Sequence, residues 1–267
     1  MAEATEKLAA AGIEAPRDEA QRLWAVSFPR QSRDYDEARD GTVLTRFQEY
    51  VARRANREPM AQITGGRNFW NHRFMVTSDV LDPRPDTETL VELALSEPFE
   101  RVLDLGTGSG CIVISLLAER MTATGMGTDI SENALAVAAE NARMAEVEHA
   151  LDLKLSNWCD TVTGQLDLIV SNPPYISAEG MTQLQPEVRN FEPHIALTDN
   201  ADGLTAYRTI AADAPRHLTP GGRLLAEIGF DQAEQVTALF KKAGLEDITC
   251  HRDLNGKDRV IAARAKK

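Results

Sequence analysis

The apolar positions in the first part of the chain recur at helical spacing. Val43, Phe47 and Val51 fall four residues apart, which places them on one face of a helix. Pro16 can occupy the first turn of an earlier helix, because a proline there costs no intrahelical hydrogen bond. This part contains no convincing strand pattern. We therefore expect a small helical domain over residues 1–62.

Short apolar runs alternate with helical stretches in the second part of the chain. Before them, residues 63–82 carry aromatic side chains around Asn71-His72, which is typical of a hairpin or an irregular linker. The last two runs flank Asn255-Gly256, a pair that favours an antiparallel hairpin. Residues 83–267 are thus predicted to form an α/β domain with a doubly wound, mostly parallel sheet and one reversed edge. The seven expected strands are residues 101–105, 125–129, 151–155, 166–171, 223–228, 247–252 and 259–264.

Composition narrows the class of protein. The chain has 267 residues, of which 43% are hydrophobic and 26% charged, and this is typical of a soluble globular protein. No apolar stretch approaches the ~20 residues of a membrane span, and the acidic N-terminus is not a secretory signal. Cys111, Cys159 and Cys250 form no CxxC pair, so neither a disulfide framework nor a metal site is expected. These features predict a cytoplasmic protein.

Charge is unevenly distributed. The net charge of −12 falls entirely after residue 80. An enzyme that binds nucleic acid would usually carry a basic surface, and the sequence indicates none. We therefore expect no direct nucleic-acid partner. A cluster of four arginines in the helical part is either a solvated helix face or a docking surface for acidic residues of a protein partner. Its members are Arg46, Arg53, Arg54 and Arg57.

A glycine-rich turn, DLGTGSG at residues 104–110, separates the first expected strand from a helix. Glycines without a Cβ let a ligand approach the backbone, and the following helix N-terminus directs its N–H groups at that ligand. A dinucleotide fingerprint would place its third glycine where this chain has Cys111, which weakens that interpretation. Asp129 ends the next strand, where a carboxylate can accept from both hydroxyls of a ribose. Turn and carboxylate together predict a nucleoside-bearing cofactor.

The segment SNPPY, residues 171–175, leaves the fourth expected strand. Ligands of open α/β sheets bind beyond the carboxyl ends of the strands, so this segment should lie beside the glycine turn. The prolines fix the backbone and leave two carbonyl acceptors, the Asn172 side-chain oxygen and the Pro173 backbone oxygen. Two acceptors suit a planar –NH2 group, and Tyr175 adds a flat face for a planar substrate. This is an orienting site with no acid–base pair.

Together, DLGTGSG, Asp129 and NPPY resemble the class I S-adenosylmethionine-dependent methyltransferases that modify amide or exocyclic amino nitrogen. Four further motifs narrow the resemblance to the peptide chain release factor glutamine N5-methyltransferases, over nearly the whole chain. They are PRPDTE (83–88), EP (192–193), DGL (202–204) and EIG (227–229).

This resemblance implies a Rossmann-like fold and methyl transfer to the side-chain amide of the glutamine in a release factor's Gly-Gly-Gln loop, with S-adenosylhomocysteine as product. It implies release factors as protein partners, and we also expect a monomer that does not associate with a membrane. The glycine turn would hold the methionine part of the cofactor, Asp129 the ribose and Trp158 the adenine. The implied site residues are Gly106, Thr107, Gly108, Ser109, Gly110, Asp129 and Trp158 for the cofactor, Asn172, Pro173, Pro174 and Tyr175 for the glutamine, and Asp104, Thr87, Glu88 and Asn157 in support.

Some alternatives stay open from the residues alone. Trp158 could be a core indole, and Thr87 and Glu88 could simply cap a helix. Two positions depart from the family pattern: Asn157 stands where relatives often have Asp, and Asp82 where they have an apolar residue. The competing functions are a DNA or RNA amino-methyltransferase, a ribosomal-protein glutamine methyltransferase, and a non-catalytic cofactor-binding module or oxidoreductase.

Overall fold

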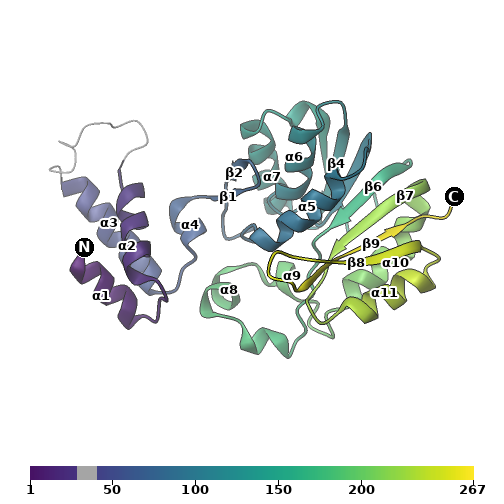
Figure 1. Cartoon of the computed structure of the whole chain (residues 1–267). Coiled ribbons are helices and arrows are strands. Elements are labelled where there is room, and N and C mark those ends of the chain that lie inside the picture. The colour runs from purple at the N-terminus through teal and green to yellow at the C-terminus, as the bar shows by residue number, and fades with distance from the viewer. Residues whose placement is uncertain (29–40) are drawn as a thin grey trace. The chain divides into compact units, whose positions relative to one another are not determined.

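The computed structural model describes residues 1–28 and 41–267, and the chain divides into two compact units (Figure 1). Unit 1 comprises Met1–Gly66 and Gln185–Phe191, and unit 2 comprises Arg67–Leu184 and Glu192–Lys267. Residues 29–40 of the expected helical domain lie outside the described residues. None of the helices within the described ranges is both long and apolar enough to cross a membrane.

Unit 1 is helical and has its own small core. Leu8, Leu23 and Phe47 are buried in it, and Trp24 packs edge-on against Phe47. Pro16 begins the second helix, as the sequence predicts. The helices are α1 (Ala2–Ala10), α2 (Pro16–Val26), α3 (Gly41–Ala55), α4 (Met60–Thr64) and α8 (Pro186–Phe191).

The arginine cluster of unit 1 is largely an internal ion network. Arg54 on α3 is buried, and its guanidinium contacts Glu19 and, at 3.1 Å, Glu187 of α8. Arg57 approaches the same Glu187 at 2.6 Å, and Arg53 pairs with Glu58. Both expectations for this cluster, a solvated face or a free docking surface, are therefore wrong for Arg54 and Arg57, whose charges are neutralised within the unit. The sequence could not reveal this, because Glu187 lies 130 residues downstream of Arg57.

Unit 2 contains the predicted seven-stranded sheet, in the order β5-β4-β3-β6-β7-β9-β8. All neighbours pair in parallel except β9, which is antiparallel to both β7 and β8. The largest difference from the expected bounds is in β7, which begins at Leu218 and not at residue 223: Leu218 pairs with Leu166, and TPGG (residues 219–222), although typical of a turn, forms an irregularity inside the strand. The strands are β3 (Arg101–Leu105), β4 (Thr124–Asp129), β5 (Leu151–Leu155), β6 (Leu166–Ser171), β7 (Leu218–Glu227), β8 (Glu246–Arg252) and β9 (Asp258–Arg264).

Helices cover both faces of the sheet (Figure 1). Successive strand residues point to opposite faces, so Val102 packs in one layer and Leu103 in the other. The apolar run Leu168-Ile169-Val170 is buried throughout because both faces are covered. One layer holds α5 (Glu88–Leu95), α6 (Cys111–Glu119) and α7 (Glu132–Met144), and the other holds α10 (Thr205–His217) and α11 (Ala233–Lys242).

Shorter elements complete unit 2. A two-stranded hairpin turns at Trp70-Asn71, within the stretch expected to be a hairpin or linker. Beyond it, Asp82 is buried and accepts a hydrogen bond from Arg67 at 3.1 Å, which accounts for a carboxylate at this position. The remaining elements are β1 (Arg67–Phe69), β2 (His72–Phe74), the 3-10 helices η2 (Pro85–Thr87), η3 (Glu148–Ala150) and η4 (Gly180–Gln183), and α9 (His194–Leu197).

Candidate active site

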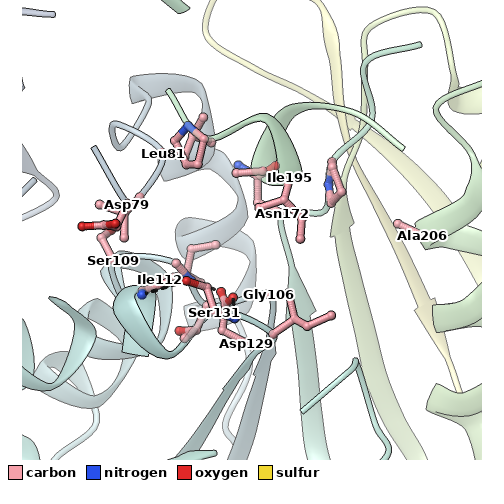
Figure 2. A pocket seen from close by; sticks show the side chains of 18 of the residues that line it. Asp79, Leu81, Gly106, Ser109, Ile112, Asp129, Ser131, Asn172, Ile195 and Ala206 are labelled. Atoms are coloured by element: carbon pink, nitrogen blue, oxygen red, sulfur yellow. Dashed lines mark hydrogen bonds between the residues drawn. The ribbon is translucent and has the colours of Figure 1, made fainter. Parts of the chain in front are cut away.

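A cavity of about 370 Å³ lies beyond the carboxyl ends of β3, β4 and β6, which is where ligands of open α/β sheets bind (Figure 2). The glycine turn, the end of β4 and the segment after β6 all contribute to it, and Figure 2 shows Gly106, Asp129 and Asn172 around the same space. Most of the residues predicted for the site are brought together here. Those that line the cavity are Thr87, Gly106, Thr107, Gly108, Ser109, Asp129, Asn157, Trp158, Asn172 and Pro174.

The glycine turn has the geometry of a ligand cradle. Gly106 and Gly108 have φ values of 70° and 55°, a left-handed conformation that favours glycine. A Cβ on Gly108 would meet nothing within 4 Å, so the space beside it is open. Gly110 has a different role, since a Cβ there would lie 2.7 Å from Ile114 Cδ1 and obstruct the packing of α6. Gly110 accordingly does not line the cavity.

Asp129, the last residue of β4, accepts hydrogen bonds that hold the glycine turn in place. One carboxylate oxygen accepts from the Gly108 backbone N–H and the other from the Ser131 N–H, both at 2.9 Å. Ser131 in turn caps α7 by accepting from Ala134. Each carboxylate oxygen has a second lone pair, so Asp129 can hold the turn and still accept from a ligand hydroxyl.

Trp158 faces the glycine turn from the segment after β5. Its backbone has φ 52°, an uncommon conformation for a residue with a bulky side chain, and the ring lies 3.8 Å from where a Gly106 Cβ would be. The indole is partly buried against the core and also lines the cavity. The neighbouring Asn157 directs its amide nitrogen at Asp160, 3.4 Å away, which leaves its oxygen available as an acceptor.

Asn172 has one orientation fixed by a neighbour. Its Nδ2 donates to Thr87 Oγ1 at 3.2 Å, so the side-chain oxygen is left as an acceptor. Thr87 precedes α5 but makes no capping hydrogen bond, and its hydroxyl serves Asn172. Tyr175 does not line the cavity, nor does Pro173; the tyrosine hydroxyl lies 3.5 Å from Glu227 Oε1.

The loop before α10 fixes the backbone that follows NPPY. Gly203 has φ 75°, and a Cβ on it would lie 2.2 Å from the Tyr175 carbonyl oxygen. Gln232 donates to that oxygen and to the Gly203 carbonyl, at 3.0 and 3.3 Å. The Asp199 carboxylate accepts backbone hydrogen bonds in the same loop, which hold its pKa at about 2 despite partial burial. The DGL motif therefore has a structural explanation as the support of NPPY.

Two predicted supporting carboxylates lie outside the cavity. Glu88 accepts from the Trp70 N–H at 2.8 Å and so anchors the β1–β2 hairpin. Asp104 is fully buried and accepts from Thr107 Oγ1 at 2.8 Å, while its Oδ1 has no partner among the described residues. Burial raises the pKa of Asp104 to about 7, although the Thr107 hydrogen bond opposes the shift.

The buried Asp104 predicts a pH-dependent stability. Its ordinary pKa is 3.8 and its folded value about 7, so the folded state binds the extra proton between these pH values. Stability should therefore be greatest at the acid side of this window and fall as the pH rises to about 7. Thermal unfolding of the ligand-free protein at pH 5 and 8 should show a smaller fall in the Asp104→Asn variant. An equal fall in both proteins would contradict the assignment.

Sequence reasoning missed several residues that line the cavity. Arg84 belongs to PRPDTE and pairs with the buried Glu192 of the EP motif at 2.6 Å. Ile130 and Ile195 are exposed apolar side chains on its rim. The motifs PRPDTE and EP contain Arg84 and Glu192, but no local sequence pattern indicates that these two residues form an ion pair.

The sheet order, the glycine turn and the NPPY segment define a class I methyltransferase. Solved structures support this fold: a methyltransferase from Pyrococcus furiosus has a TM-score of 0.56 at 15% identity, over 73% of this chain and 89% of that one. The hMettl16 catalytic domain, solved with the MAT2A 3'UTR hairpin 6, has a TM-score of 0.61 at 16% identity, over 82% of both chains. At these identities the likeness concerns the fold alone.

The chain belongs to the release factor glutamine methyltransferase family. It is 51% identical to the release factor glutamine methyltransferase of Cereibacter sphaeroides, over 98% of this chain and 95% of the relative. The protein of that name from Rhodospirillum rubrum is 44% identical, over 97% and 82%. The methyltransferase small domain family matches residues 67–187, and the PrmC N-terminal domain family matches residues 1–65.

Proposed function

We propose that this chain transfers the methyl group of S-adenosylmethionine to the side-chain amide nitrogen of the glutamine in the Gly-Gly-Gln loop of peptide chain release factors. The observation that carries this proposal is the orientation of Asn172, whose amide nitrogen is occupied by Thr87 and whose oxygen remains an acceptor beside the cavity. An acceptor held in this way suits an –NH2 group. The names of the relatives point to the same substrate.

The residues of the cavity fit the cofactor. Gly106 and Gly108 leave open backbone where a Cβ would intrude, Asp129 keeps lone pairs for ribose hydroxyls, and Trp158 offers an aromatic wall opposite Gly106. The Asn157 oxygen can accept from an exocyclic amino group, so asparagine at this position is compatible with adenine. When bound, S-adenosylmethionine supplies an electrophilic methyl group on its sulfonium, and S-adenosylhomocysteine is left.

The protein's contribution to methyl transfer is orientation. An amide nitrogen is a poor nucleophile because its lone pair is delocalised. The Asn172 side-chain oxygen, which lines the cavity, can accept from an N–H group of the glutamine amide, and this contact orients the amide and favours positive charge as it develops on nitrogen. No base is required before attack, because methylation leaves a positively charged nitrogen whose acidified N–H can then pass its proton to water.

A parallel methylation assay tests the proposed substrate. Labelled S-adenosylmethionine should be incubated with purified release factor, ribosomal proteins and DNA, and the labelled residue mapped by peptide analysis. We expect label on the glutamine of the Gly-Gly-Gln loop. Label on a ribosomal-protein glutamine or on DNA, with none on release factor, would replace this proposal with one of its competitors.

Asp129→Ala should weaken binding of S-adenosylhomocysteine, measured by calorimetry, by about 1–3 kcal/mol, because ribose acceptors and the anchor of the Gly108 N–H are lost. The maximal rate at saturating cofactor should change less. Glu132→Gln is the matched control, since it removes a nearby carboxylate, in the first turn of α7, that does not line the cavity. Equal effects of the two changes would make Asp129 a simple helix-end charge.

We also propose that the helical unit 1 recognises the body of the release factor, and that the enzyme acts as a monomer in the cytoplasm without direct nucleic-acid contact. A loop glutamine alone offers few contacts, so a second docking surface is expected. None of the residues assigned to catalysis or cofactor binding belongs to unit 1. Intact release factor should therefore have a much higher kcat/KM than a short Gly-Gly-Gln peptide. Similar values for the two would contradict a docking role.

A further inference from the structure

A buried carboxylate lies behind the glutamine-orienting segment. Glu227 is the last residue of β7, is 1% exposed, and has no role in the methyl transfer described for Asn172. Its Oε1 lies 3.5 Å from the Tyr175 hydroxyl, and the Thr87 hydroxyl is close enough to lower the pKa of the same carboxylate. Its Oε2 has no hydrogen-bond partner within 3.5 Å among the described residues. Glu227 therefore lies beside Tyr175, the last residue of NPPY, and near Thr87, which accepts a hydrogen bond from Asn172 at the start of NPPY.

The donors and acceptors of this cluster can be arranged in one way when Glu227 is ionised. A carboxylate only accepts, so in any hydrogen bond between Glu227 and the Tyr175 or Thr87 hydroxyl the hydroxyl is the donor. Thr87 Oγ1 then presents lone pairs to Asn172, whose Nδ2 donates at 3.2 Å. That arrangement leaves the Asn172 oxygen as the group available to a substrate. A neutral Glu227 carries its own proton and can donate it, so the neighbouring hydroxyls no longer have to act as donors.

Charged and titratable groups on several neighbouring elements act on Glu227. Arg259 of β9 attracts the carboxylate, whereas Asp86 of η2 repels it. The Tyr207 hydroxyl of α10 donates to the Glu227 backbone carbonyl at 2.7 Å. On the α6 side, Glu227 contributes to the raised pKa of Cys111. Burial dominates and raises the pKa of Glu227 to about 7.

We propose that Glu227 is a positioning residue that acts through Thr87 and Tyr175 to hold the Asn172 amide in its substrate-accepting orientation, and that it does so only in its ionised form. This inference rests on the proposed methylation of a glutamine amide. Glu227 makes no contact with the cavity itself, so it acts on the reaction through these two side chains.

The first test is the pH profile of kcat/KM for release factor, which reports ionisations of the free enzyme. With a pKa of about 7, the ionised fraction of Glu227 falls about tenfold from pH 8 to pH 6, and kcat/KM should fall with it. Glu227→Gln should lower kcat about tenfold at pH 8 and abolish this dependence, because glutamine does not ionise. Affinity for S-adenosylhomocysteine should stay within about twofold.

Asp82→Asn is the matched control, because it neutralises another buried carboxylate that does not line the cavity. It should keep the wild-type profile. Tyr175→Phe provides a second variant if Glu227→Gln folds poorly: it removes a hydrogen bond that lowers the pKa of Glu227, so the acid limb should move to higher pH. A limb that persists unchanged in Glu227→Gln, or that does not move in Tyr175→Phe, would overturn the proposal.

A readout independent of turnover separates this proposal from the proposed function. Thermal stability of the ligand-free protein should fall as pH rises from about 4.5 to 7, because the folded state holds the Glu227 proton across that window. Glu227→Gln should reduce this fall. If the wild-type enzyme methylates no release factor, the proposed function fails, whereas a stability slope unaffected by Glu227→Gln overturns the role of Glu227 by itself.

Discussion

Asn172→Ala should lower kcat about 100-fold or more, a loss of roughly 3 kcal/mol of transition-state stabilisation, the size seen when one preorganised hydrogen-bonding group is removed. The change deletes the acceptor oxygen and also the Nδ2 group that donates to Thr87. Because the other cavity residues stay in place, calorimetry should give S-adenosylhomocysteine affinity close to that of the wild type. A turnover assay with intact release factor measures the first quantity.

Asn172→Asp is the informative companion, since it keeps acceptor oxygens and loses the donor to Thr87. Its kcat should lie between those of the wild type and Asn172→Ala. If Asn172→Ala methylates at a near-normal rate, NPPY does not orient the substrate. If its cofactor affinity collapses as well, Asn172 supports the pocket as a whole and its separate catalytic role is refuted.

Gly203→Ala should reduce both stability and turnover. The residue adopts φ 75°, which costs about 1–2 kcal/mol for a residue with a Cβ. In addition, the new Cβ would lie 2.2 Å from the Tyr175 carbonyl, so the segment after NPPY must move. Displacement of about 1 Å at an orienting group is enough for a loss on the order of 100-fold in kcat.

Gly244→Ala is a control that separates the backbone strain of alanine at positive φ from displacement of the segment after NPPY. Gly244 has φ 83°, and a Cβ on it would meet nothing within 4 Å, so alanine there carries the backbone cost without a clash. Thermal melts should show a loss for both variants, and turnover should fall only for Gly203→Ala. Equal kcat values in the two variants would show that the DGL loop does not position NPPY.

Local patterns were sufficient to predict much of the molecule. The strands of the sheet follow from short apolar runs, and the start of α2 follows from Pro16. The glycine turn, Asp129 and Asn172 could be placed at one edge because parallel strands end on the same side. In each case the property depends on neighbours in sequence or on the topology of the sheet.

The features that escaped prediction depend on residues far apart in the chain. Thr87 supports Asn172 across 85 positions, and Arg84 meets Glu192 across 108. Tyr175 could be expected to face a substrate, yet its hydroxyl is directed at a buried carboxylate. TPGG is typical of a turn, but pairing of Leu218 with β6 continues the strand through it. Burial and long-range pairing decide these cases, and neither leaves a periodic signal.

The return of residues 185–191 to unit 1 makes the catalytic unit discontinuous in sequence. Glu187 is the ion partner of Arg54 and Arg57, although it lies between the NPPY and DGL motifs. A chimaera that joins the first 66 residues of one family member to the remainder of another would therefore take α3 from one parent and its counter-charge from the other. Such exchanges should succeed when residues 54, 57 and 187 are transplanted together, because loss of Glu187 leaves Arg57 without its carboxylate and the buried Arg54 with Glu19 alone, and breaking a buried ion pair is destabilising.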